Sequence, residues 1–253
     1  MSKEKIVGII GGMGPEATAD LLQRIVRLTP AEDDADHIRC LVDNNPKVPS
    51  RIRFIVEGAG ESPGPCLADM ARQLEAWGAD FLAMPCNTAH YYLPDIRAAV
   101  RIPVLDIVAV TLESARRVLE SHRGALPSGN PPSPRLVGLL GSPALRITRL
   151  YEEKARAVGT EILYPSDADQ DRVLDLIKAV KGGRKTAEMS TVLAQTADNL
   201  AARNASALVL ACTELGVIPL AQRSVPVLDA SEELAREIVR QARGDRKTAR
   251  TGH

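Results

Sequence analysis

The feature that most constrains the fold is an internal duplication, because three short segments of the first half recur in the same order in the second half. Their offsets differ by only a few residues, as expected of two related α/β units whose connecting loops differ in length. At offsets of 130, 126 and 123 residues, the matches are Val7–Gly11 with Val137–Gly141, Ala79 and Leu82 with Ala205 and Leu208, and Pro103–Asp106 with Pro226–Asp229. The sequence therefore predicts two units of one architecture.

Apolar runs typical of buried strands alternate with helical patterns, which indicates parallel sheets covered by helices on both faces. The expected strands are Ile6–Ile10, Ile38–Asp43, Ala79–Met84, Val104–Ile107, Leu136–Leu140, Glu161–Tyr164, Ala205–Leu210 and Val225–Asp229. The expected helices are Pro15–Leu28, Cys66–Ala76, Ile107–Ser121, Ala144–Ala157, Asp169–Val180, Ala187–Arg203 and Ser231–Arg243.

From this alternation we predict an α/β fold of two pseudo-symmetric domains, each a parallel four-stranded sheet flanked by helices. The expected first domain is discontinuous and the second lies within it, and the chain is expected to end in a flexible tail without an apolar face. The boundaries are residues 1–112 with 222–243 for the first domain, 113–221 for the second, and 244–253 for the tail.

Charge balance and composition exclude several classes of partner. Lys plus Arg and Asp plus Glu number 32 each, so no bulk charge attracts nucleic acid or an anionic membrane. The apolar run near the N-terminus is too short for a signal peptide or a membrane span. Four cysteines without a framework spacing or a Cys-x-x-Cys pair indicate a reducing cytoplasm and disfavour a structural metal. We expect a cytoplasmic protein without a metal.

A glycine-rich turn, Gly11–Pro15, directly follows the first expected strand. Its backbone N–H groups and the N-terminus of the next helix favour an anion. The glycines do not follow the G-x-G-x-x-G spacing, which disfavours a dinucleotide. We therefore expect Gly12, Met13 and Gly14 to bind a substrate carboxylate.

The loop after the second expected strand is stiffened by Pro46 and Pro49 and ends at Arg51. Ligands of open parallel sheets bind at the carboxyl ends of the strands. An arginine there offers a bidentate fork to a carboxylate. Arg51 is therefore a candidate substrate ligand.

Cys86 and Cys212 occupy matching positions, each just after an apolar strand and before small polar residues. These surroundings favour a reactive thiol, whereas Cys40 and Cys66 fit the pattern of small buried hydrophobes. Two thiols on either side of one carbon suit proton removal from one face and proton delivery to the other. A redox disulfide is the less favoured use, because such pairs usually occur as Cys-x-x-Cys.

Three motifs, Gly11–Thr18, Pro85–His90 and Ala211–Leu215, together resemble the aspartate/glutamate racemase superfamily, and its aspartate racemase and broad-specificity amino-acid racemase branch most closely. The resemblance implies two pseudo-symmetric domains with the site between them, no cofactor, and a homodimer. It also implies that Cys86 and Cys212 are the acid/base pair. The substrate contacts that it implies are Arg51, Asn87, Thr88, Lys178, Thr213 and Glu214.

Two departures bear on the substrate. Ser50 stands where the family usually has an aspartate before the arginine, which weakens an assignment to aspartate. The late motif reads Cys-Thr-Glu, whereas glutamate racemases have Cys-Thr-His, and this argues against that branch.

Together, these observations predict a cofactor-independent racemase of a small acidic amino acid, with aspartate first and glutamate or a broad range as alternatives. Because no electron sink is expected, preorganised donors must stabilise the carbanion. A cysteine-dependent dicarboxylate isomerase, similar to maleate isomerase, or a decarboxylase is the enzymatic alternative. A non-catalytic ligand-binding protein of the same fold is the alternative outside enzymes.

Overall fold

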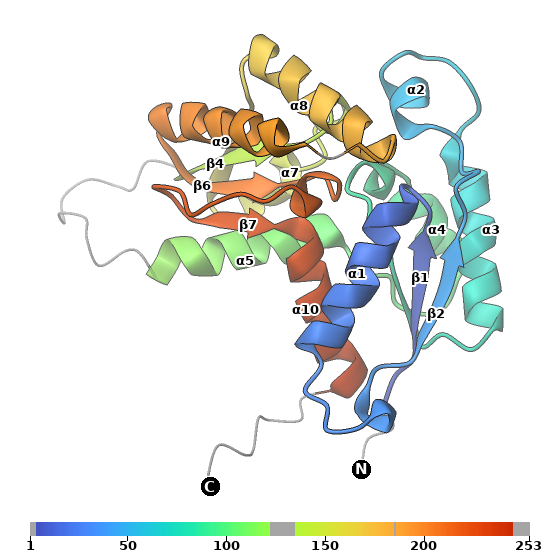
Figure 1. Ribbon diagram of the computed structural model, residues 1–253. Coiled ribbons are helices and arrows are strands. Elements are labelled where there is room, and N and C mark those ends of the chain that lie inside the picture. The colour runs from blue at the N-terminus through green and yellow to red at the C-terminus, as the bar shows by residue number, and fades with distance from the viewer. Residues whose placement is uncertain (1–3, 122–134, 185, 245–253) are drawn as a thin grey trace, which may run out of the picture.

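The computed structural model describes residues 4–121, 135–184 and 186–244, and places them in two wholly parallel sheets flanked by helices (Figure 1). The strand orders are β2-β1-β3 and β5-β4-β6-β7. The predicted α/β class is confirmed. The first sheet has three strands rather than four, because the segment expected as Val104–Ile107 contributes one parallel bridge, from Val104 to Leu82. Of the expected tail, 244–253, only Gly244 is among the described residues.

The first half is built around β1 (Val7–Gly11), whose five residues are all buried. Its two neighbours are β2 (Cys40–Asn44) and β3 (Phe81–Ala83). The helices of this half are α1 (Pro15–Leu28), α2 (Arg51–Ile55), α3 (Pro63–Ala76), α4 (Leu93–Ala99) and α5 (Ile107–Ser121), with 3₁₀ turns η1 (Asp34–Asp36) and η2 (Thr88–Tyr92). α1 and α3 both begin at a proline, whose missing N–H has no helical partner to lose at that position.

The second half repeats this arrangement with β4 (Arg135–Leu140), β5 (Thr160–Leu163), β6 (Ala205–Leu210) and β7 (Val227–Asp229). Its helices are α6 (Pro143–Thr148), α7 (Glu152–Ala157), α8 (Asp167–Lys181), α9 (Ala187–Ala202) and α10 (Ala230–Arg243), with a 3₁₀ turn η4 (Leu215–Val217). The single helix expected over Ala144–Ala157 is two helices, because Arg149 adopts a left-handed φ of 53° that ends α6.

The expected inclusion of 222–243 in the first domain stays a prediction, although β7 belongs to the second sheet. β7 pairs with β6 at the edge of the second sheet, where Leu228 lies opposite Val209. α10 then turns away from that sheet and packs against α1 and α5 (Figure 1). The physical reason is that β6 has an edge that can pair with β7, while the apolar face of α10 is buried by helices of the first half.

One glycine in each half shows that the duplication extends to packing. A Cβ atom on Gly8 would lie 2.6 Å from a methyl carbon of Leu82, and a Cβ atom on Gly138 would lie 2.6 Å from a methyl carbon of Leu208. Real side chains do not approach so closely, so a larger residue at either position would displace the leucine of the neighbouring strand. A shared core that includes Val7 of β1, Val137 of β4 and residues of α5 and α10 joins the halves.

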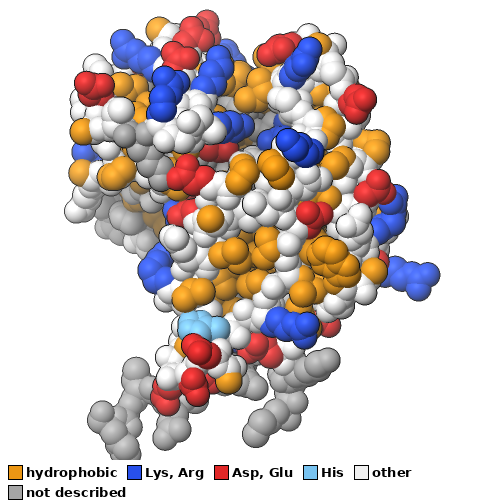
Figure 2. Space-filling model, turned by 45° about the vertical axis from the view of Figure 1, so that its right-hand side comes forward, with side chains coloured by type: hydrophobic (Ala, Val, Ile, Leu, Met, Phe, Trp, Pro, Cys, Tyr) orange, Lys and Arg blue, Asp and Glu red, His pale blue; other side chains and the backbone are white. Residues whose placement is uncertain are grey.

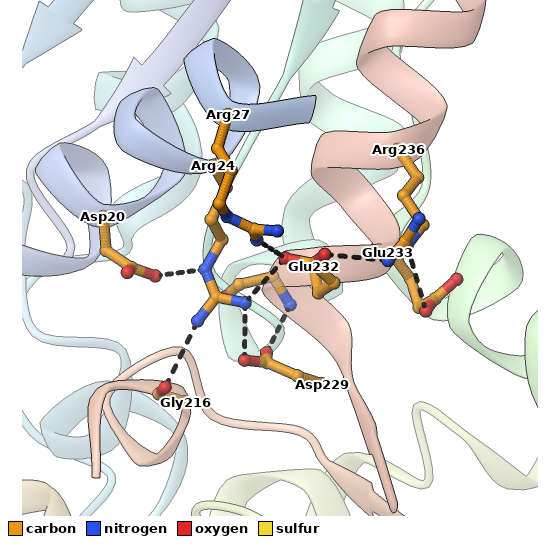
Figure 3. A network of polar contacts seen from close by, with 9 residues as sticks. Asp20, Arg24, Arg27, Gly216, Asp229, Glu232, Glu233 and Arg236 are labelled. Atoms are coloured by element: carbon orange, nitrogen blue, oxygen red, sulfur yellow. Dashed lines mark hydrogen bonds and ion pairs between the residues drawn. The ribbon is translucent and has the colours of Figure 1, made fainter. Parts of the chain in front are cut away.

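A half-buried ionic network attaches α1 to the end of the second sheet (Figure 3). Arg24 lies 2.6 Å from Asp20, 2.8 Å from Asp229 and 3.2 Å from Glu232. Arg24 also donates to the carbonyl of Gly216 in η4, at 3.2 Å. A cleft of about 1000 Å³ beside this network contains Asp20 and Asp229 but neither Cys86 nor Cys212. Both acids form ion pairs with Arg24, which gives them a structural role.

The surface carries no single-sign field on the face displayed in Figure 2, where Lys and Arg side chains intermingle with Asp and Glu. This agrees with the formal net charge of zero. Within the described part of the chain, none of the helices combines the length and the apolar character needed to cross a membrane.

Candidate active site

The carboxyl ends of β3 and β6 meet at a small cavity that both cysteines line. The cavity measures about 30 Å³, and because one water needs roughly 10–15 Å³ of such space, it has room for only a few water molecules. Binding an amino acid therefore requires its walls to separate. The lining residues are Met13, Ser50, Arg51, Ile52, Cys86, Asn87, Thr88, Ser142, Ile177, Lys181, Ala211, Cys212, Thr213 and Glu214.

A buried histidine fixes the loop that carries Cys86. The Nε2 atom of His90 accepts the N–H of Ile107 at 3.1 Å, and its Nδ1 atom lies 2.9 Å from the carbonyl oxygen of Cys86. Because Nε2 accepts a hydrogen bond, the proton of the neutral ring is on Nδ1, and this N–H group donates to the carbonyl oxygen of Cys86. Burial lowers the pKa of His90, so the ring is neutral. His90 thus holds the backbone of Cys86 without contacting the thiol.

Asn87 is oriented by a tyrosine from the second half. The Tyr151 hydroxyl donates to Asn87 Oδ1 at 2.5 Å, and both side chains are buried. Asn87 Nδ2 has no hydrogen-bond partner among the described residues. A buried amide donor without a partner is costly, so Asn87 can offer this N–H group to an anion bound in the cavity.

The thiol of Cys212 contacts a carboxylate. Its Sγ atom donates to Glu214 Oε2 at 2.9 Å, and the Nζ atom of Lys181 lies 3.8 Å from Glu214 Oε1. Burial first, and then the Glu214 carboxylate, raises the pKa of the Cys212 thiol well above its usual value. Cys212 is therefore protonated at neutral pH.

Arg51 is only 9% exposed and lines the cavity at the start of α2. Its guanidinium donates to the carbonyls of Pro49 at 3.1 Å and Met13 at 3.1 Å. No carboxylate pairs with it among the described residues, so its charge is open to a bound anion. Ser50, the departure noted above, caps α2 by accepting the N–H of Arg53 at 3.2 Å.

The glycine turn contacts Arg51 through the carbonyl oxygen of Met13, whereas the N–H of Gly12 is not available to a substrate. The N–H of Gly12 donates to Thr18 Oγ1 at 2.9 Å, so it is not free for a carboxylate. Gly12 has a φ of 89°, and a Cβ atom there would collide with the backbone of Asn45. Met13 lines the cavity, while Gly14 precedes α1 as its N-cap. Of the three predicted contacts, only Met13 lines the cavity.

Lys181 stands where Lys178 was predicted. Both residues are in α8 and both are exposed, but Lys178 is not among the residues that line the cavity. Lys181 does line it, one helical turn later. The inward face of this turn follows from Ile177, which is fully buried and directs the positions three and four residues onward toward the site.

Hydroxyl groups connect the two halves beside the cysteines. Thr88 Oγ1 lies 2.9 Å from Ser142 Oγ, and Thr213 Oγ1 donates to the carbonyl of Pro85 at 3.2 Å. Sequence reasoning missed several site residues, namely Ser142, Tyr151, Ile52, Ile177, Lys181 and Ala211. The duplication contained a signal for Ser142, because the offset of 130 residues pairs it with Gly12.

Among residues 4–121, 135–184 and 186–244, no group of three or more His, Cys, Asp and Glu side chains has an arrangement that could hold a metal ion. The four cysteines are unpaired. The polar groups that line the cavity are thiols, hydroxyls, an amide, two cations and one carboxylate.

Comparisons with known proteins converge on one family. Residues 10–238 match the family described as Asp/Glu/Hydantoin racemase. The chain is 28% identical over 239 residues to the broad specificity amino-acid racemase of Bacillus subtilis, covering 92% of this chain and 96% of that protein. The solved aspartate racemase of Picrophilus torridus aligns with a TM-score of 0.75 and 31% identity over 94% of each chain. An aspartate racemase homologue from Pyrococcus horikoshii, 22% identical, has the same fold, with a TM-score of 0.70 over 95% of this chain and 100% of that one.

Proposed function

Because the chain belongs to the Asp/Glu/Hydantoin racemase family, and racemases are isomerases, we propose that it racemises an amino acid without a cofactor. Cys86 and Cys212 are the two acid/base groups of this proposal. In one direction a thiolate removes the α-proton from one face of the substrate, and the thiol on the other side delivers a proton to the opposite face. The reverse direction exchanges the two roles.

The observation that carries the proposal is that two thiols from matching strand ends of the two halves line one cavity. A single thiol suffices to protonate or to add to a substrate. Inversion at carbon without a cofactor needs an acid and a base on opposite faces, and a site between two related halves supplies one from each.

The remaining lining residues supply what a carbanion needs. The free N–H of Asn87 and the hydroxyl of Thr88 are donors fixed by contacts that cross between the halves, while the hydrogen of the Thr213 hydroxyl is taken by the carbonyl of Pro85. Donors fixed in advance stabilise developing charge without reorganisation. Arg51 and Lys181 are cations within reach of a bound carboxylate.

We propose aspartate as the first substrate to test. It is supported by the aspartate racemase of Picrophilus torridus among the relatives and by Arg51, a cavity-lining cation that no carboxylate pairs with among the described residues. The similarity to a broad specificity amino-acid racemase makes neutral amino acids the second class to test.

The decisive experiment incubates purified protein with single enantiomers of a panel of amino acids in D₂O, without added cofactor. α-Deuterium exchange together with the appearance of the other enantiomer supports the racemase. Turnover of maleate instead supports the related isomerase, and binding without either reaction supports a non-catalytic protein.

We also propose a homodimer in a reducing compartment such as the cytoplasm. The resemblance to the family supports the dimer, and the four unpaired cysteines support the compartment. Light scattering tests the dimer, because a mass of 27.2 kDa would show a monomer.

A further inference from the structure

Glu214 is a buried carboxylate in an unusual place, since it is 4% exposed and accepts a hydrogen bond from a thiol that lines the cavity. A buried charge is retained only where partners compensate its lost hydration. The Nζ atom of Lys181 lies 3.8 Å from Oε1, which has no hydrogen-bond partner among the described residues, and the Cys212 thiol donates to Oε2 with its Sγ atom 2.9 Å away.

The matching position in the first half has a different residue. The offset of 126 residues that pairs Cys86 with Cys212 pairs Thr88 with Glu214. The Thr88 hydroxyl contacts Ser142, and among the described residues no carboxylate accepts a hydrogen bond from the Cys86 thiol. The two cysteines thus have the same position in the fold but unlike neighbours.

A carboxylate beside a thiol opposes the formation of a second negative charge. The groups that face Cys212 are Glu214 from its own loop, Lys181 from α8, and Cys86 and Tyr151 from other segments. Only Lys181 among them favours the thiolate, and it is shared with Glu214.

We propose that Glu214 makes the two cysteines unequal, because its carboxylate holds Cys212 as the thiol and leaves Cys86 as the base of the resting enzyme. This inference rests on the proposed racemase function and assigns the starting state of its two acid/base groups. From that state, Cys86 takes the α-proton as the substrate C–H bond breaks. The Cys212 S–H bond then breaks as its proton goes to the other face of the carbon. Glu214 acts through Cys212 and does not contact the reacting carbon.

Alkylation by iodoacetamide across a pH series tests the resting state, with the two cysteine peptides separated by mass spectrometry. In the unaltered protein we expect Cys86 to reach its half-maximal rate at a lower pH than Cys212. Glu214→Gln should move the Cys212 midpoint down by about one pH unit, a roughly tenfold rate gain at a fixed pH below it. The Cys86 midpoint should move less. Glu188→Gln on the exposed surface of α9 is the matched control and should change neither midpoint.

An unchanged or raised Cys212 midpoint in Glu214→Gln overturns the proposal, as does a Cys212 midpoint at or below that of Cys86 in the unaltered protein. Should Glu214→Gln not fold, Lys181→Met decides, because loss of the cation must raise the Cys212 midpoint, and an unchanged midpoint overturns the proposal. Alkylation needs no turnover, so a protein that racemises nothing can still show this order of thiols.

A half-reaction gives a second readout that general damage to the fold would not reproduce. The β-chloro derivative of the racemised amino acid loses its α-proton to one cysteine and then loses chloride, so no second proton transfer is needed. Cys86→Ala and Cys212→Ala identify which enantiomer each thiol deprotonates. Glu214→Gln should speed elimination from the enantiomer assigned to Cys212 severalfold relative to the other. Equal changes for both enantiomers would overturn the assignment.

Discussion

The Cys86 loop and the Cys212 loop follow corresponding strands of a duplicated fold, yet their chemistry differs. On the Cys86 side, neutral His90 fixes the backbone and Asn87 presents an amide. On the Cys212 side, Glu214 places a carboxylate on the thiol itself. The two halves repeat the packing of a glycine against a leucine, Gly8 on Leu82 and Gly138 on Leu208. They do not repeat the charged groups beside the two thiols. Duplication therefore places one thiol from each half at the same cavity, and the different residues beside the two thiols carry our proposal that the cysteines are unequal.

The largest expected effect comes from removing either thiol. Cys86→Ala and Cys212→Ala should each lower racemisation by on the order of 10³ or more, because inversion needs both faces. Chiral chromatography of the product measures this. Cys40→Ala and Cys66→Ala are the matched controls and should keep nearly full activity, because neither thiol lines the cavity. Near-normal racemisation by either of the first two variants would defeat the two-base mechanism.

The second largest expected effect comes from substituting Arg51, which lines the cavity. Arg51→Lys keeps the charge but loses the planar fork, so we expect kcat/KM for an acidic substrate to fall roughly tenfold or more, and further for Arg51→Ala. Arg53→Lys, on the exposed side of the same short helix, should change little. Equal losses for acidic and neutral amino acids would place Arg51 at the α-carboxylate, and no loss would remove it from the site.

A smaller effect is expected from removing the hydrogen bond that orients the Asn87 amide. Tyr151→Phe removes the hydroxyl that orients Asn87, leaving Oδ1 without its donor. We expect a severalfold drop in kcat/KM and a loss of about 1–3 kcal/mol in the free energy of unfolding, measured by urea titration. Tyr91→Phe, at a tyrosine that is 49% exposed, is the control. Unchanged activity would show that the orientation of Asn87 does not depend on Tyr151.

The smallest effect is a pH dependence that belongs to the Cys86 side. Burial lowers the pKa of His90 below its ordinary value of 6.5. As the pH falls below 6.5, the unfolded chain binds a proton that the folded protein excludes, so stability should decline by at most about 1.4 kcal/mol per pH unit. His90→Gln should be less stable near neutral pH but should show a flatter decline. An identical slope in urea titrations of both proteins would contradict the neutral histidine.

Much of the fold follows from local signals in the sequence. The predicted bounds of α1, α5 and β6 agree with the structure, because their ends are marked by residues that act over a turn or two, such as Pro15. α2 was not predicted, since five residues inside a proline-rich loop give no measurable periodicity. The pairing of β7 with the second sheet was not predicted, because strand pairing is a contact between distant segments, which a short apolar run does not specify.

The sequence by itself determined that two cysteines lie at equivalent strand ends, because a duplicated pattern of apolar runs places both at the carboxyl edges of parallel sheets. Only the tertiary structure decided which charged groups join them. Lys178 and Lys181 lie in the same last turns of α8, and the packing of Ile177 selects Lys181 for the cavity. The Gly12 N–H is taken by Thr18, and the Cys212 thiol is taken by Glu214. Which partner a side chain contacts depends on the position of its end to within an ångström or two. Sequence spacing predicts only the helix, strand or loop on which that side chain lies.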